Sequence, residues 1–110
     1  MADSTGTYAV VFITASSSDE ARLLAETLVA EHLAACVSIV AQVQSTYMWE
    51  GRLEHSEECL LICKTRTGLF NRLETRVRSL HSYEVPEIIQ VPITDGSEAY
   101  LSWLGGATAP

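Results

Sequence analysis

A histidine and two carboxylates lie close together around a proline in the segment 81–87, which reads H-S-Y-E-V-P-E. Proline fixes its own φ and restricts the residue before it, so Glu84 and Glu87 are held in defined directions. Imidazole and carboxylate groups are ligands for borderline divalent ions such as Cu(II) or Zn(II), and His81 is the best single candidate. In the competing interpretation, the two glutamates bond to backbone or pair with a basic residue at a subunit junction.

A second set of candidates combines a lone lysine with large aromatic side chains. Lys64 is the only lysine of the chain. We expect it to pair with Glu84 or Glu87, or to hold an anion at the mouth of a pocket. Four amphipathic aromatic residues are expected at an interface between subunits, where with Lys64 and Tyr83 they would wall a pocket. These four are Tyr47, Trp49, Tyr100 and Trp103.

The three cysteines, Cys36, Cys59 and Cys63, form no C-x-x-C pair. In a strand, Cys59 and Cys63 would lie roughly 13 Å apart, because each residue advances the chain by about 3.3 Å. A disulfide needs Cα atoms within about 7 Å, so we expect packed thiols rather than a disulfide or a shared metal. Unpaired cysteines and a polar N-terminus without an apolar signal region predict a reducing, cytoplasmic location.

The amino-acid composition restricts the classes of partner that the chain is expected to bind. The 110 residues suit a single domain, residues 1–110, and carry 14 acidic against 7 basic side chains, a formal charge of −7. Nucleic acid and anionic membranes are therefore excluded as expected partners, because both are bound through clustered Lys and Arg. No apolar run approaches the roughly 20 residues of a membrane helix.

The first half of the chain predicts a strand, a helix and a long hairpin. Residues 7–14 are β-branched and aromatic, and Ser17 with Glu20 forms a capping box for a helix of about four turns. A strand over 35–47 and a second ending near Cys63 surround a turn at 50–52. A hairpin of this length would project beyond a small domain, so a neighbouring subunit is expected to cover it.

The second half predicts a helix, an edge strand and a short last helix. Thr67 is expected to cap the helix, 81–87 to be a loop, and 88–93 to be a strand that ends at Pro92. Ser97 is expected to cap a helix through Leu104, followed by a frayed tail over 105–110. The order β-α-β-β-α-β predicts an α+β, ferredoxin-like sandwich, a fold that by itself does not specify function.

Five segments, in this order and at these spacings, carry a resemblance to the CutA divalent-cation tolerance family. They are L-A-A-C-V-S-I-V (33–40), Y-M-W-E-G (47–51), C-K-T-R (63–66), S-L-H-S-Y-E-V-P-E-I-I (79–89) and Y-L-S-W-L (100–104). The resemblance covers about residues 8–104. It implies a tight homotrimer whose long hairpins wrap onto neighbours, a role in tolerance of copper and other divalent cations, and no catalytic activity. It also implies a regulatory role like that of the PII signalling proteins.

The chain departs from the copper-binding pattern of some family members. Those members carry a cysteine near the end of the first strand and two adjacent histidines before the Y-x-x-P-E segment. This chain has Phe12-Ile13-Thr14 and Leu80-His81 at these places. One ligand of three remains, which argues against tight copper binding there, and no cofactor is expected to be needed for folding.

Three other function classes compete with this interpretation. A hydrolase such as acylphosphatase needs a glycine- and arginine-bearing phosphate loop after the first strand, but residues 14–18 are T-A-S-S-S. An RNA-recognition module needs exposed aromatics on its central strands and a basic surface, whereas the strand core here is C-L-L-I-C. The third is a structural or adaptor trimer that binds a partner protein or a small anionic ligand between subunits, without a metal role.

Overall fold

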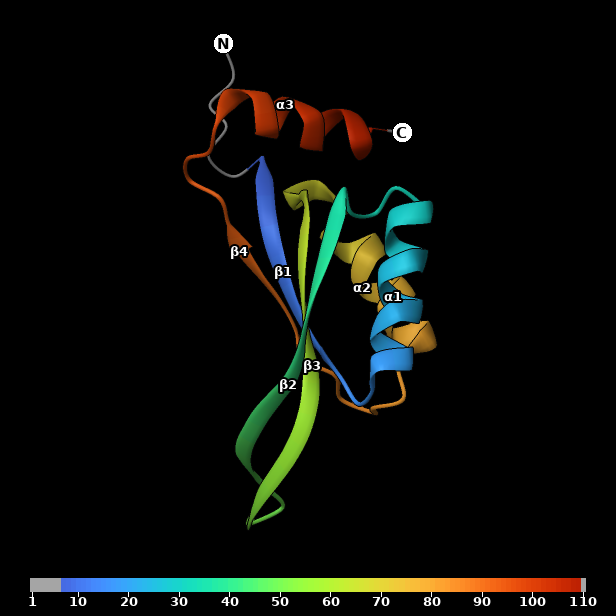
Figure 1. The fold of residues 1–110 in the computed structure, drawn as a ribbon, viewed down its shortest axis with the longest axis vertical. Helices are drawn as coiled ribbons and strands as arrows, with labels where there is room; N and C mark the ends of the chain where they lie inside the picture. Colours follow the sequence, from blue (N-terminus) through green and yellow to red (C-terminus); the bar gives the residue numbers. More distant parts are fainter. Residues whose placement is uncertain (1–6, 110) are drawn as a thin grey trace.

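The computed structural model describes residues 7–109, which build a four-stranded antiparallel sheet of order β2-β3-β1-β4 (Figure 1). In chain order the elements are β1 (Tyr8–Ala15), α1 (Ser18–Ala30), β2 (Cys36–Trp49), β3 (Arg52–Arg66), a 3-10 turn (Thr67–Leu69), α2 (Phe70–Leu80), β4 (Ile88–Pro92) and α3 (Glu98–Ala107). Helices α1 and α2 cover one face of the sheet. The predicted ferredoxin-like α+β fold with a short C-terminal helix is therefore confirmed.

The core forms between the central strand β1 and the two helices. Ile13 of β1 lies opposite Leu61 of β3 and Ile88 of β4. Ile13, Leu61, Leu24 of α1 and Leu73 of α2 are fully buried in one cluster. Burial of each such side chain stabilises the fold by about 1.5–3 kcal/mol, so this cluster fixes the sheet and the helices relative to each other.

Strands β2 and β3 form the predicted hairpin, which projects well beyond the helices (Figure 1). The molecule is 50 Å long but only 25 and 22 Å across. Glu50 and Gly51 have φ values of 50° and 79°, which is the geometry of a two-residue type I′ turn. A β-bulge lies between Val40 and Val43, where Gln42 has a φ of 60°. The bulge marks the place where the hairpin leaves the body of the domain.

The start of α2 differs from the prediction, because Thr67 does not cap it. The chain enters α2 through the 3-10 turn, so Thr67 lies inside the helical segment rather than at its N-cap. Neither Arg66 nor Leu69 supplies a side-chain cap, and the Thr67 hydroxyl is buried without a hydrogen-bond partner among the described residues.

The predicted frayed tail is also wrong for residues 105–108, because α3 continues to Ala107 and Thr108 caps it. Arg66 anchors this end of the helix: its Nη2 donates to the Gly105 carbonyl at 2.7 Å and its Nε to Thr108 Oγ1 at 3.0 Å. A cation at a helix C-terminus is favourable. A Cβ at Gly105 would lie 2.6 Å from the Tyr8 hydroxyl, so glycine permits the close approach. Pro110, the last residue of the predicted tail, lies outside the described residues.

Candidate functional site

His81 lies at the end of α2, where the structure uses both nitrogens of its ring. Nε2 lies 2.7 Å from the Thr14 carbonyl, so it must be the donor, and Nδ1 accepts from the Tyr83 backbone N–H at 3.0 Å. The side chain is fully buried and packs against the Tyr83 ring, with centroids 4.8 Å apart. The imidazole therefore fastens the loop to β1, and it has no free nitrogen for a metal ion.

Glu20, which sequence reasoning treated only as part of a capping box, lies beside His81. Its Oε1 accepts from the Ser16 backbone N–H at 2.8 Å and from the Ser16 hydroxyl at 2.9 Å, and its Oε2 accepts from the Ser82 N–H at 2.7 Å. The carboxylate also lies 3.8 Å from His81 Nδ1. An ion pair would need a proton on Nδ1, but Nδ1 accepts from Tyr83, so we interpret this approach as packing. Glu20 thus joins the start of α1 to the loop.

The Glu20 contacts predict a specific acid sensitivity. Burial alone would raise the pKa of this carboxyl, but the hydrogen bonds from Ser16 and Ser82 outweigh it and lower the pKa from 4.5 to about 2. Because the folded-state pKa is depressed, the stabilisation is present above about pH 4.5 and is lost as pH falls toward 2. It amounts to about 2–3 kcal/mol. Urea unfolding of Glu20→Gln between pH 7 and pH 2.5 should show a lower free energy of unfolding at neutral pH and a shallower loss in acid.

Glu26→Gln is the control for this prediction, because Glu26 is exposed on the same helix. It should match the wild-type chain at every pH. Equal acid slopes for the wild type and Glu20→Gln would contradict the role assigned to the Glu20 carboxylate.

A buried carboxylate, Glu58 of β3, was also missed by sequence reasoning. The Tyr83 hydroxyl donates to Glu58 Oε2 at 2.9 Å. Burial, with a smaller contribution from this bond, raises the pKa of Tyr83 to about 12. The local sequence places Glu58 in a strand, but its partner lies 25 residues further along the chain. Tyr83 therefore connects the loop to the base of the hairpin.

The two loop glutamates stay at the surface. Glu84 and Glu87 are both exposed, and Glu84 lines a hollow of about 490 Å³ together with Tyr83, Pro86 and Arg78. Among the described residues, no three His, Cys, Asp or Glu side chains come together as a group that could hold a metal ion. The predicted set of His81, Glu84 and Glu87 therefore does not form a metal site within one chain, because His81 turns inward to the backbone.

The residues predicted to wall an inter-subunit pocket are spread over the length of the molecule. Tyr47 and Trp49 lie near the hairpin tip, whereas Tyr100 and Trp103 pack together on α3, at the opposite end (Figure 1). Lys64 lies in the sheet, where its Nζ donates to Ser38 Oγ at 3.4 Å; no ion pair with Glu84 or Glu87 is found within residues 7–109. One chain alone does not assemble these residues into a pocket.

The three cysteines are free, and Cys59 and Cys63 are buried. Burial raises the pKa of the Cys63 thiol to about 12. Since the thiolate is the reactive form of cysteine, Cys63 behaves as a packed apolar side chain, as predicted.

The face of the sheet opposite the helices is largely apolar and is uncovered by the described residues, with Lys64 and Ser38 as polar side chains on it. Side chains alternate along a strand, so the neighbours of the buried residues in each strand point to this face. Val40, Ile89 and Val91 are 44%, 51% and 44% exposed on it. With them lie Val10, Phe12, Leu60 and Ile62, as the strand register requires. We call these seven residues the open face.

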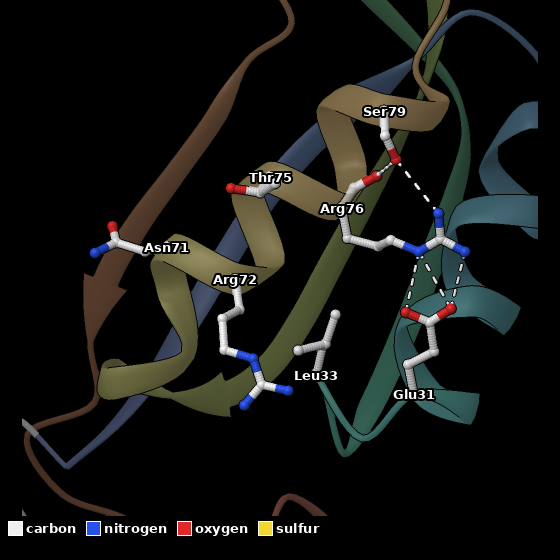
Figure 2. A pocket seen from close by; sticks show the side chains of 7 residues that line it. All are labelled: Glu31, Leu33, Asn71, Arg72, Thr75, Arg76 and Ser79. Atoms are coloured by element: carbon white, nitrogen blue, oxygen red, sulfur yellow. Dashed lines mark hydrogen bonds and ion pairs between the residues drawn. The ribbon is translucent and has the colours of Figure 1, made fainter.

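A separate hollow lies between α1 and α2 (Figure 2). Arg76 closes one side of it by donating to both oxygens of Glu31 at 2.9–3.1 Å. This hydrogen-bonded pair lowers the pKa of Glu31. In Figure 2 the Arg72 side chain extends from α2, and no hydrogen bond or ion pair joins it to the other residues drawn.

Within residues 7–109, none of the helices has the length and apolar character required to cross a membrane.

The model of one protein family, described as CutA1 divalent ion tolerance protein, matches residues 9–107. The divalent-cation tolerance protein CutA of Thermus thermophilus is 48% identical over 95 residues, which are 86% of this chain and 92% of that protein. The chloroplastic CutA of Arabidopsis thaliana is 46% identical over 90% of this chain, which spans 54% of that protein.

Solved structures agree with the described fold. The Cut A1 protein of Thermus thermophilus matches with a TM-score of 0.91 at 46% identity, covering 93% of this chain and 99% of that one. CutA1 from Oryza sativa matches with a TM-score of 0.92 at 40% identity, covering 96% of this chain and 97% of that one.

Proposed function

Because the chain belongs to the CutA1 divalent ion tolerance family, we propose that this CutA-type tolerance protein acts as a homotrimeric binding protein with a regulatory, PII-like role. In this proposal the chain holds no resident metal ion at His81. Tolerance of divalent cations then depends on the ligand of the assembled trimer, which is a small molecule or a partner protein. The proposal includes no catalytic step.

The open face is the observation that best supports a homotrimer. It combines seven apolar side chains on one surface with a hairpin that projects far beyond its own core. Monomeric proteins rarely leave such large contiguous apolar surfaces in water. A second and a third copy would cover the face and the hairpin at once. The same assembly would bring the hairpin tip of one copy, with Tyr47 and Trp49, toward a neighbouring copy. There it would meet one or more of Lys64, Tyr83, Tyr100 and Trp103. This contact would form the inter-subunit pocket predicted from the sequence.

The donor chemistry argues against a resident Cu(II) or Zn(II) ion. Both nitrogens of His81 bond to protein atoms, and burial favours the protonated thiol of Cys63, whereas a metal needs the thiolate. Glu84 and Glu87 alone are two exposed carboxylates, which are weak ligands for these ions.

Calorimetric titration of the metal-stripped protein with Cu(II) and Zn(II) tests this proposal. We expect no saturable binding near one ion per chain, and only weak heats that are the same for Glu84→Gln, Glu87→Gln and the control Glu26→Gln. Tight stoichiometric binding that is lost in Glu84→Gln or Glu87→Gln would establish a metal site at the loop and overturn the proposal.

A reducing compartment such as the cytoplasm is proposed for this chain, since its three free thiols suit one. Relatives are named for other compartments: the Arabidopsis thaliana protein is chloroplastic, and the matching Archaeoglobus fulgidus structure is described as a periplasmic divalent cation tolerance protein.

A further inference from the structure

A hollow of about 620 Å³ lies where the end of α1, the 3-10 turn and the end of α3 meet. Its lining includes His32, Arg66, Gly68, Arg72 and Thr108. We call it the end hollow. It shares Arg72 and Glu31 with the hollow of Figure 2, so the two adjoin along α2. None of its residues belongs to the loop 81–87 or to the open face.

The end hollow is basic in a strongly acidic chain. Arg66 and Arg72 line it, and the only acid in its lining, Glu31, is already paired with Arg76. The chain as a whole carries twice as many acidic as basic residues. A site with this local reversal of charge attracts anions, because the repulsion from the remaining acids is screened over about 8–10 Å at ordinary ionic strength.

The donors in the end hollow differ in how firmly they are held. Arg66 is fixed in place by the Gly105 carbonyl and the Thr108 hydroxyl. Arg72 has no hydrogen bond or ion pair with any described residue, so all of its guanidinium donors are available. Gly68 is exposed, and nothing lies within 4 Å of the position that a side chain would take. A ligand can therefore reach the backbone of the 3-10 turn between the two arginines.

From this arrangement we propose that the end hollow binds the phosphate group of a small phosphorylated molecule. Guanidinium groups match phosphate oxygens through paired, charge-assisted hydrogen bonds. In this assignment the unpaired guanidinium of Arg72 binds the phosphate, Arg66 supplies a fixed positive charge beside it, and His32 lines the same hollow. The volume exceeds that of a phosphate ion, and the adjoining hollow beside Leu33 and Asn71 leaves room for the remainder of the molecule. The assignment does not depend on the trimer.

The test is a calorimetric and ¹H–¹⁵N NMR titration of the full chain with inorganic phosphate, at constant ionic strength set with sodium chloride. We expect saturable binding, with the largest amide shifts at Gly68 and Leu69. Arg72→Gln should weaken binding about tenfold, because it removes a charged hydrogen-bond donor while leaving the α3 anchor intact. Arg22→Gln is the matched control, since Arg22 is an exposed arginine of α1 that does not line the end hollow.

Two results would overturn the assignment. One is the absence of saturable phosphate shifts at Gly68 and Leu69. The other is an equal loss of affinity in Arg22→Gln and Arg72→Gln, which would indicate diffuse attraction to any arginine. Wild-type affinity in Arg22→Gln, with a tenfold loss in Arg72→Gln, supports it.

Discussion

Ile62→Glu is expected to convert the proposed trimer into a folded monomer. Ile62 lies in the middle of the open face, opposite Phe12 of β1 and Ser38 of β2. In a single chain this position is only partly buried, so a glutamate can reach water and the fold should survive. In a trimer the same change would take three carboxylates out of water, and their desolvation would cost several kcal/mol each even with Lys64 nearby. Sedimentation velocity at micromolar concentration measures the mass, and circular dichroism checks the fold.

The control for this prediction is Leu23→Glu, which places the same charge on an exposed position of α1, on the opposite side of the sheet. This variant should remain a trimer. A trimeric Ile62→Glu would show that the open face is not the interface and would remove the main support for the proposed assembly.

His81→Ala is expected to cost about 2–4 kcal/mol of unfolding free energy. The substitution leaves a cavity and removes the partner of both the Thr14 carbonyl and the Tyr83 N–H. A buried polar group without a partner and a cavity in the packing each destabilise a folded protein by about 1 kcal/mol or more. The effect should appear in urea unfolding with no metal added, because the role assigned to His81 is structural.

His55→Ala is the matched histidine control, since His55 is exposed on the hairpin and its ring hydrogen-bonds to the Thr46 hydroxyl, at 3.1 Å. It should change the unfolding free energy by less than about 0.5 kcal/mol. An His81→Ala protein as stable as His55→Ala would contradict the structural role, and the imidazole would then be a candidate ligand again.

Local patterns were sufficient to predict most of the fold. The β-branched run of β1, the capping serine of α1 and the turn at Glu50-Gly51 each depend on neighbours in sequence, and the structure has all three. Prediction failed where a distant residue decides the outcome. The end of α3 reads as a tail because two glycines weaken a helix, and it is held partly by Arg66, which lies 39 residues before Gly105.

The candidate site was less accessible to sequence reasoning for the same reason. The sequence indicates that the segment 81–87 is unusual, but its side chains have partners far away in sequence. Thr14 is 67 residues from His81, and Glu58 is 25 residues from Tyr83. A histidine near carboxylates looks the same in a sequence whether its ring faces a metal or a backbone carbonyl. The conformation of the loop determines which of the two partners the ring meets.

The bulge at Gln42 has a consequence for how the protein matures. Below it, β2 and β3 lie in a four-stranded sheet, but beyond it they form a two-stranded ribbon, which is marginally stable in water by itself. Before it assembles with other copies, a newly synthesised chain would therefore have a folded four-stranded domain and a frayed outer ribbon. The monomer made by Ile62→Glu should preserve this stage, with faster amide exchange beyond the bulge than below it. Assembly would then protect the ribbon against proteolysis, which links the lifetime of the chain to its concentration in the cell.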